Sequence, residues 1–339
     1  MNPHAMRELI YDKIVLVTGG TGSIGSEIVR QVLSYQPKAV RVFSRDEAKQ
    51  FDLQYELKEH NNIRYMIGDV RDKSRLGWAM EGVNIVFHAA ALKQVPSCEY
   101  NPFETVKTNV LGTQNVIETA LDERVSRVIA VSTDKAALPT NTMGASKLLA
   151  ERLIAAANFY KGLPHTRLCA VRFGNVLGSR CSIIPILVQQ IQKGGPVTVT
   201  NRDATRFIMS IKDAVRLVLK AACITNGGEI FVLKMPTMRI GDLIDVMIEE
   251  YAPVFGKDPG DILVENIKLR RGEKLHEDLL TEEESLYVTE QEEMYAVNYF
   301  NGQSKHVFCY KSQQQPALSK DELRSLLREE GVLCLHQPC

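Results

Sequence analysis

The stretch Ile14-Val15-Leu16-Val17-Thr18-Gly19-Gly20-Thr21-Gly22-Ser23-Ile24-Gly25 joins an apolar run directly to a glycine-rich segment. Consecutive apolar residues, several of them β-branched, are typical of a strand that is buried on both faces. The three glycines at Gly-x-x-Gly-x-x-Gly spacing supply a tight turn, a close approach of the backbone to a pyrophosphate, and close packing of the following helix. The stretch therefore predicts a dinucleotide-binding loop.

The phosphates are expected at the N-terminus of the helix that begins near Ser23, where free N–H groups and the helix dipole favour negative charge. The residues predicted to contact the cofactor here are Thr18, Gly19, Thr21, Gly22, Ser23, Ile24 and Gly25.

Apolar runs alternate with helical patterns through the first half of the chain. Strands are expected at 14–18, 39–43, 64–67, 85–88, 128–132 and 169–173, and helices at 25–34, 74–80, 103–121 and 143–160. Such alternation implies a parallel sheet with helices on both faces. We therefore predict an α/β fold, a Rossmann-type doubly wound parallel sheet with a smaller C-terminal substrate-binding domain.

Prolines at 185, 196, 236, 253 and 259 interrupt the second half. A dinucleotide-binding domain is predicted over 10–178, and 211–235 is predicted to return to it. Residues 179–210 and 236–295 are predicted to form the substrate domain, and 296–339 a C-terminal extension. Its terminal helix opens with Ser319-x-x-Glu322, which is the spacing of a capping box.

Composition excludes several classes of protein. The 41 basic residues balance the 41 acidic ones, so no strong overall field attracts nucleic acid or an anionic membrane. No apolar run reaches the about 18 residues of a transmembrane helix, and 1–11 lack the apolar stretch of a signal peptide. The seven cysteines are scattered without a Cys-x-x-Cys pair. We expect a cytoplasmic protein with reduced thiols, no metal site, and no nucleic-acid or membrane partner.

The end of the second expected strand bears on which dinucleotide is bound. Ser44, Arg45 and Lys49 stand where the cofactor ribose is expected, and two cations suit a 2′-phosphate. Asp46 is the alternative, because it could take the ribose hydroxyls instead. We therefore favour NADP.

Two further segments are predicted to contact the cofactor. Asp69 and Val70 follow the third expected strand, where they would meet the adenine ring. Ala89, Ala90 and Ala91 follow the fourth and are small enough for close approach of the backbone.

A second constellation follows the apolar run 128–132. Thr133, Asp134 and Lys135 stand at the carboxyl end of this expected strand, where open α/β sheets bind ligands. An adjacent carboxyl and amine can serve as acid and base. Met143 and Lys147 lie four apart on one helix face, and Lys147 could hold the nicotinamide ribose. Met143 has no proton to exchange, so a degraded site in a binding protein is the alternative.

Several longer motifs carry a close resemblance over about residues 10–290. They are SRDE at 44–47, HAAALKQVP at 88–96, KTN at 107–109, STDKAA at 132–137, GNV at 174–176, SR at 179–180, TRF at 205–207 and RGEKLHE at 271–277. With these motifs the chain resembles the UDP-N-acetylglucosamine 4,6-dehydratases, in the nucleotide-sugar branch of the extended short-chain dehydrogenases.

This resemblance implies a reaction. UDP-N-acetylglucosamine would become a UDP-4-keto-6-deoxy-N-acetylhexosamine, the first step of a bacterial surface-glycan pathway such as that of pseudaminic acid. The NADP would be tightly bound and recycled, so the net reaction is a dehydration. The chain would form homo-oligomers, dimers built through the 103–121 and 143–160 helices and assembling further into hexamers.

The resemblance also implies roles for individual residues. Lys135 would remove the C5 proton, Asp134 would protonate the departing C6 hydroxyl, and Thr133 would bond the sugar near O4. Lys147 would position the ribose. The residues implied to hold the substrate are Lys93, Thr133, Asn175, Thr198, Arg206, Arg270 and Glu273, and Lys93, Thr108 and Asn175 are also implied to contact the cofactor.

Two positions depart from the common family pattern. Met143 replaces the tyrosine of Tyr-x-x-x-Lys, as in a Met-x-x-x-Lys subgroup, which leaves the base for the C4 hydroxyl unassigned. Cys181 stands where glycine is usual. A UDP-sugar epimerase of the same fold and an inactive NADP-binding regulator are the alternatives, and the C5 configuration of the product stays open.

Overall fold

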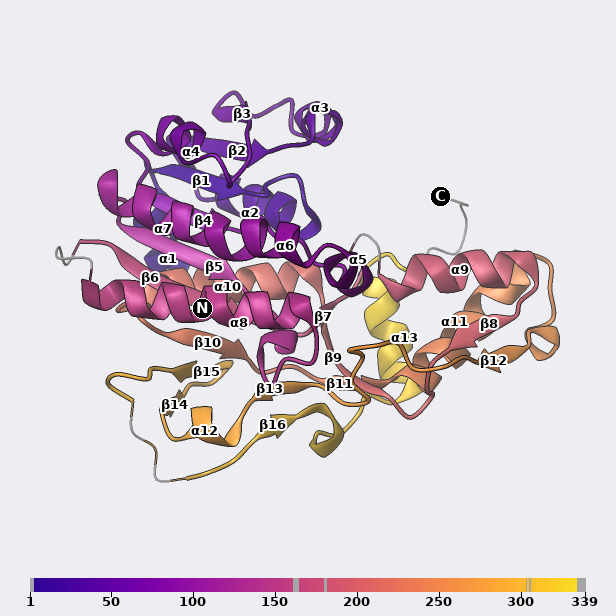
Figure 1. Cartoon of the computed structure of the whole chain (residues 1–339). Coiled ribbons are helices and arrows are strands. Elements are labelled where there is room, and N and C mark those ends of the chain that lie inside the picture. The colour runs from indigo at the N-terminus through magenta and orange to yellow at the C-terminus, as the bar shows by residue number, and fades with distance from the viewer. Residues whose placement is uncertain (1–2, 161–164, 180–181, 303, 305, 334–339) are drawn as a thin grey trace. The chain divides into compact units, whose positions relative to one another are not determined.

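The computed structural model describes residues 3–160, 165–179, 182–302, 304 and 306–333 (Figure 1). Arg180 and Cys181, which the sequence analysis singled out, lie outside these described residues. The chain forms two compact units. Unit 1 contains Met1–Phe173, Lys212–Lys234 and Leu280–Cys309, and unit 2 contains Gly174–Ile211, Met235–Leu279 and Tyr310–Cys339.

Unit 1 is built on a nine-stranded sheet in the order β14-β15-β10-β6-β5-β4-β1-β2-β3. The strands from β3 to β10 are parallel, and β15 and β14 are antiparallel additions at one edge. The strand bounds are β1 Ile14–Thr18, β2 Ala39–Ser44, β3 Ile63–Ile67, β4 Ile85–His88, β5 Arg127–Val131, β6 Arg167–Arg172, β10 Ile230–Leu233, β14 Val288–Glu290 and β15 Met294–Val297. The order 3-2-1-4-5-6 is that of a dinucleotide-binding sheet, so the predicted α/β fold is confirmed.

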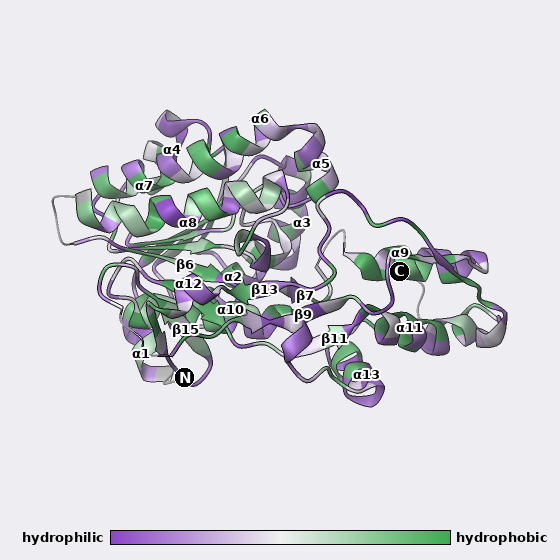
Figure 2. Cartoon of the chain, turned by 60° about the horizontal axis from the view of Figure 1, so that its bottom comes forward, coloured by the Kyte–Doolittle hydropathy of each residue, from purple (hydrophilic) through white to green (hydrophobic). Residues whose placement is uncertain are grey.

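Helices cover both faces of this sheet (Figures 1 and 2). One face carries α4, α7 and α8, and the other carries α1, α2 and α10. The helix bounds in unit 1 are α1 Pro3–Ile10, α2 Ser23–Leu33, α3 Glu47–Glu56, α4 Lys73–Met80, α5 Val95–Tyr100, α6 Pro102–Thr105, α7 Gly112–Asp122, α8 Thr142–Tyr160, α10 Ile211–Ile224 and α12 Glu282–Ser285. The expected single helix over 103–121 is instead α6, a π-helix at Val106–Leu111, and α7.

The segment from 280 to 297 corrects the predicted domain boundary, because it belongs to unit 1. Strand β15 pairs with β10 along Ile230–Leu233. The fully buried Arg172 of β6 also binds two carboxylates, Glu151 of α8 at 2.6 Å and Glu284 of α12 at 2.8 Å. A buried cation needs such partners, so Glu284 fixes this segment to the sheet.

Unit 2 has its own core. Its strands are β7 Asn175–Val176, β8 Val197–Val199, β9 Thr205–Met209, β11 Thr237–Arg239, β12 Val264–Asn266, β13 Asp278–Leu280 and β16 Tyr310–Lys311, and its helices are α9 Ile183–Lys193, α11 Ile240–Val254 and α13 Lys320–Glu329. Leu323 and Leu327 of α13 pack against the apolar face of α11. The predicted extension is therefore divided: 296–309 belongs to unit 1, and 310–339 belongs to unit 2. The Ser319–Glu322 capping box is present.

In the described part of the chain, no helix combines the length and apolarity needed to cross a membrane.

Candidate active site

The glycine-rich loop after β1 has the geometry of a phosphate cradle. Gly19 has a φ of +66°, and a Cβ at this position would lie 2.7 Å from the backbone nitrogen of Ala90. A Cβ on Gly25 would lie 2.2 Å from the carbonyl oxygen of Gly19. Gly22 caps α2 without a side-chain hydrogen bond, which leaves the helix N-terminus open to an external acceptor. The loop therefore fits a dinucleotide.

Behind the loop, a buried hydrogen-bonded chain fixes the ends of β1 and β4. His88 Nδ1 lies 2.7 Å from Thr18 Oγ1, and its Nε2 lies 3.1 Å from Thr113 Oγ1. Burial, with a smaller contribution from the charge of Lys147, lowers the pKa of His88 to about 3, so this imidazole is neutral. Thr18 has no exposed surface. Thr18 therefore supports the loop from behind, and its predicted contact with the cofactor stays a prediction.

At the end of β2, both predicted cations have carboxylate neighbours. Asp46 caps α3 by accepting from the Lys49 backbone nitrogen, and it also accepts from Lys49 Nζ. Arg45 is 54% exposed and lies 3.7 Å from Asp69, so its guanidinium remains open to a ligand. Ser44 is buried, and its hydroxyl accepts from Gln50.

Asp69 and Val70 follow β3, as predicted, but both are engaged within the protein. Burial alone would raise the pKa of Asp69, but hydrogen bonds from Arg71 and the charges of Arg71 and Arg45 lower it. Val70 is buried, and a Cβ on Gly112 of α7 would meet its side chain.

The π-helix positions a residue to which the sequence analysis gave no role. Asn109 is buried and holds the backbone of Leu92 from both sides, through N–H to Oδ1 at 2.8 Å and Nδ2 to the carbonyl at 3.0 Å. Its Nδ2 also donates to Ser146 of α8. Two structural features mark this pair of hydrogen bonds to Leu92: the extra residue of the π turn and the buried side-chain amide of Asn109. Lys93, next to Leu92, is exposed, and the buried Thr108 hydroxyl makes no hydrogen bond with a described residue.

The Thr-Asp-Lys segment after β5 forms one connected group. Asp134 is fully buried, and its Oδ1 accepts from Thr133 Oγ1 at 2.8 Å and Lys135 Nζ at 3.0 Å. Its Oδ2 is buried and has no hydrogen-bond partner among the described residues. Thr133 is partly exposed, and the Lys135 side chain is 25% exposed. The carboxylate therefore reaches a ligand only through its neighbours.

Helix α8 places Met143 and Lys147 beside this group. A Cβ on Gly144 would lie 2.2 Å from the Lys135 carbonyl oxygen, so glycine allows the helix to pack directly on the Thr-Asp-Lys segment. Met143 is buried, and Lys147 Nζ donates to the Val131 carbonyl at 2.5 Å. Burial lowers the pKa of Lys147 to about 8, partly offset by Glu151.

Among the predicted substrate residues of unit 2, Arg206 uses most of its hydrogen-bond donors within the protein. It is 7% exposed, and its guanidinium donates to the carbonyl oxygens of Thr205, Leu275 and Lys274. Glu273 lies 3.6 Å away. Three of its five N–H donors are used within the protein, and its predicted contact with the diphosphate stays a prediction. Arg206 holds the RGEKLHE segment in place.

The segment that Arg206 holds presents other groups. Glu273 accepts from Thr200 Oγ1 at 3.0 Å and from the Arg270 backbone nitrogen at 3.2 Å. The Arg270 and Arg271 side chains are exposed and pair with no described residue. Thr198 exchanges two hydrogen bonds with Gln190 of α9, and Asn175 is partly exposed at the start of β7. Within the described residues, no group of three or more His, Cys, Asp or Glu side chains could hold a metal ion.

Comparisons with known proteins agree with this geometry. A family model described as polysaccharide biosynthesis protein matches residues 15–299. A Methanocaldococcus jannaschii protein described as an uncharacterized membrane protein is 56% identical over 324 residues, 95% of this chain and 97% of that protein. The crystal structure of Pen from Bacillus thuringiensis superposes with a TM-score of 0.90 at 46% identity, covering 95% of this chain and 98% of that one.

Two named activities occur among the other relatives. The UDP-N-acetylglucosamine 4,6-dehydratase (inverting) of Campylobacter jejuni is 42% identical over 288 residues, 84% of this chain and 83% of that protein. The UDP-glucose 4-epimerase of Rickettsia rickettsii is 39% identical over 336 residues, 94% of this chain and 96% of that protein.

Proposed function

The chain belongs to the polysaccharide biosynthesis protein family, in the nucleotide-sugar dehydratase and epimerase branch of the short-chain dehydrogenases, and we propose that it is a 4,6-dehydratase. Its substrate is UDP-N-acetylglucosamine, and its product is a UDP-4-keto-6-deoxy-N-acetylhexosamine. The observation that carries this proposal is the buried Asp134 carboxylate, bonded to both Thr133 and Lys135.

A dehydration needs an acid for the departing C6 hydroxyl and a base at C5. Asp134 accepts the C4 hydroxyl proton through Thr133 and later releases it with the C6 hydroxyl as water. Lys135, in its neutral form, takes the C5 proton and later delivers a solvent-exchanged proton to the same carbon. Each step leaves the two groups ready for the next, and the substrate loses one water overall.

The glycine-rich loop and Lys147 are proposed to hold the dinucleotide. The dinucleotide would supply hydride acceptance at C4 and hydride return at C6, so it would be recycled, and we propose that it stays tightly bound. Arg45 supports NADP over NAD, because its guanidinium is exposed and a 2′-phosphate offers it a bidentate partner. Lys49 adds positive charge one turn further on, and its ammonium group also forms an ion pair with Asp46.

Unit 2 is proposed to bind the UDP moiety. Arg270 is the candidate for the diphosphate, because its guanidinium is exposed and unpaired within the described residues. Glu273 fixes the Arg270 backbone, and Arg206 fixes the segment that carries both. Asn175 and Thr198 complete the proposed substrate set.

We also propose a cytoplasmic homo-oligomer that supplies a surface-glycan pathway. Apolar side chains support a dimer through the α6–α8 region: Phe103, Leu111 and Leu149 are 70%, 52% and 49% exposed. Exposed apolar side chains that gather on neighbouring helices are typical of a subunit interface.

Incubation with UDP-N-acetylglucosamine tests the proposal. Mass spectrometry is expected to show a product lighter by one water, without net reduction of added dinucleotide. In deuterated water, one deuterium is expected at C5. A product of unchanged mass would contradict the dehydratase, and unchanged substrate would favour an inactive dinucleotide-binding regulator.

A UDP-sugar 4-epimerase is the second candidate, because relatives of almost equal identity carry that name. An epimerase needs no acid for a departing C6 hydroxyl, so Asp134 and Lys135 would have no role at C5 and C6. Its signature is a product of unchanged mass with inverted C4 and no deuterium at C5.

A further inference from the structure

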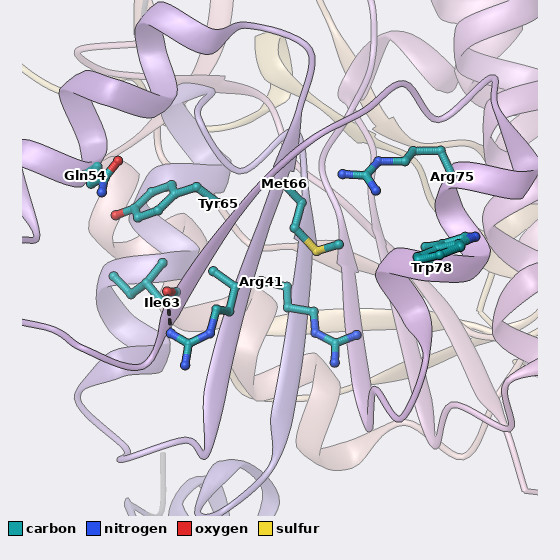
Figure 3. A pocket seen from close by; sticks show the side chains of 8 residues that line it. Arg41, Gln54, Ile63, Tyr65, Met66, Arg75 and Trp78 are labelled. Carbon is teal, nitrogen blue, oxygen red and sulfur yellow. Dashed lines mark hydrogen bonds between the residues drawn. The ribbon is translucent and has the colours of Figure 1, made fainter.

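A shallow depression of about 750 Å³ lies at the β2–β3 end of the sheet in unit 1 (Figure 3). Arg41 and Arg64 of the two strands and Arg75 of α4 line it, together with the rings of Tyr65 and Trp78. Figure 3 shows Arg75 and Trp78 across Met66 from Tyr65. No carboxylate belongs to the lining.

The three arginines are an unusual group for a sheet edge. Arg41 and Arg64 stand directly opposite each other in the β2–β3 register. Like charges in such a pair destabilise a sheet unless another group compensates them. Within the described residues, no carboxylate lies within 4.0 Å of any of the three guanidinium groups. The depression therefore carries net positive charge, and Glu81 adds negative charge near Arg41 without a direct ion pair.

Backbone carbonyls orient these guanidinium groups without using all their donors. Arg41 Nη1 donates to the carbonyls of Ala79 and Glu81, both at 2.8 Å. Arg64 Nη1 and Arg75 Nε each donate to carbonyl oxygens at 2.9 Å. A guanidinium has five N–H groups, so each arginine keeps donors for a ligand. Arginines held in place in this way lose less side-chain freedom when they bind phosphate than mobile ones do.

Trp78 adds a flat surface beside this charge. It is 74% exposed, and it is the only tryptophan of the chain. An exposed indole offers a stacking platform for a nucleobase, worth about 1–3 kcal/mol per base in nucleic-acid binders. The volume also lies within the roughly 300–1,000 Å³ typical of small-molecule sites.

We propose that this depression is a second nucleotide site, which binds a nucleoside di- or triphosphate with its phosphates on the three arginines and its base on Trp78. It differs from the dinucleotide loop. Arg41 precedes Ser44 by three residues, about 10 Å along β2, whereas the loop meets the carboxyl ends of the strands. The inference does not depend on the proposed function, because its test needs no turnover.

Intrinsic fluorescence provides the test, since all tryptophan emission comes from Trp78. Full-length protein loaded with one equivalent of NADP is titrated with ADP, UDP and inorganic pyrophosphate. A saturable change with ADP or UDP is expected, at least about tenfold tighter than with pyrophosphate. Arg64→Glu should weaken nucleotide binding at least about tenfold. Lys38→Gln, which alters an exposed charge outside the depression, should leave it unchanged.

Calorimetry of Trp78→Ala is the second measurement, because this variant has no emission. With NADP bound, it should lose affinity for ADP and keep its affinity for pyrophosphate, and UDP is left out because unit 2 is proposed to bind it. The inference is overturned if no titration saturates, if Arg64→Glu binds like the wild type, or if pyrophosphate binds as tightly as ADP and UDP.

Discussion

Thr133 Oγ1 donates a 2.8 Å hydrogen bond to Oδ1 of Asp134, a carboxylate with no exposed surface of its own. The threonine is the partly exposed member of this pair. A proton that passes between Asp134 and a sugar hydroxyl must therefore cross the Thr133 hydroxyl or the Lys135 amine. In the proposed dehydratase, this relation would make Thr133 a proton relay, in addition to its predicted contact with the sugar.

Replacing Thr133 tests the relay. Thr133→Val keeps the shape and removes the hydroxyl, so kcat is expected to fall by about 10²–10⁴, the usual contribution of positioned proton transfer. Thr133→Ser keeps the hydroxyl and should retain most of kcat. Steady-state kinetics of the two variants make the comparison. A Thr133→Val variant that loses no more kcat than Thr133→Ser would contradict the relay.

Arg45 is expected to set the cofactor preference. Arg45→Glu places like charge against a 2′-phosphate, so the Kd for NADP should rise at least about tenfold more than the Kd for NAD. Calorimetric titration of both dinucleotides measures the difference. Lys38→Gln is the matched control, since it alters an exposed charge elsewhere in unit 1. Equal weakening of both dinucleotides by Arg45→Glu would exclude contact with the phosphate.

Lys147 should make stability depend on pH. Burial lowers its pKa to about 8 in the folded protein, below the ordinary value of 10.5. Between these values the unfolded chain binds more protons, so the free energy of unfolding rises with pH across this window. Lys147→Met should flatten this rise in the free energy of unfolding. The stability of the variant relative to the wild type should be greatest below pH 8. Parallel urea-unfolding curves of the two proteins at pH 7 and pH 10 would argue against a desolvated ammonium.

The Arg172 network should fix the 280–297 segment to unit 1. Arg172 and the hydrogen bonds it gives overcome the effect of burial and lower the pKa of Glu284 to about 2. Glu284→Gln leaves half of the arginine unpaired in a buried place, and about 3–5 kcal/mol of stability should be lost. Glu290→Gln, at an exposed ion pair with Lys234, should cost under about 1 kcal/mol. Similar denaturant midpoints for the two variants would contradict this role.

The sequence analysis located the fold because its signals are local. The run at 14–18, the glycine spacing and the alternation of elements each depend on neighbouring residues, and β1, β4 and α4 lie within one residue of their expected bounds. Strands β15 and β14 were missed, since their place depends on pairing with β10 and on Glu284 reaching Arg172, 112 residues away.

Long-range contacts also limit what the sequence predicts about the candidate site. The grouping of Thr133, Asp134 and Lys135 follows from adjacency in the chain and was expected. The burial of Thr18 and the commitment of Arg206 to backbone carbonyls depend on partners far along the chain, His88 and Leu275. A motif identifies a residue type at a position, whereas distant partners decide whether its polar atoms face a ligand.

The central claim is that Asp134 acts first as base for the C4 hydroxyl and then as acid for the C6 hydroxyl, in place of the group that Met143 cannot supply. Stopped-flow absorbance of reduced nicotinamide, after mixing with UDP-N-acetylglucosamine, tests it most directly in Asp134→Asn and Lys135→Met. Asp134→Asn should show no transient, because the C4 hydroxyl keeps its proton. Lys135→Met should show the transient but release no product lighter by one water. A transient at the wild-type rate in Asp134→Asn would contradict the account and place the C4 base elsewhere.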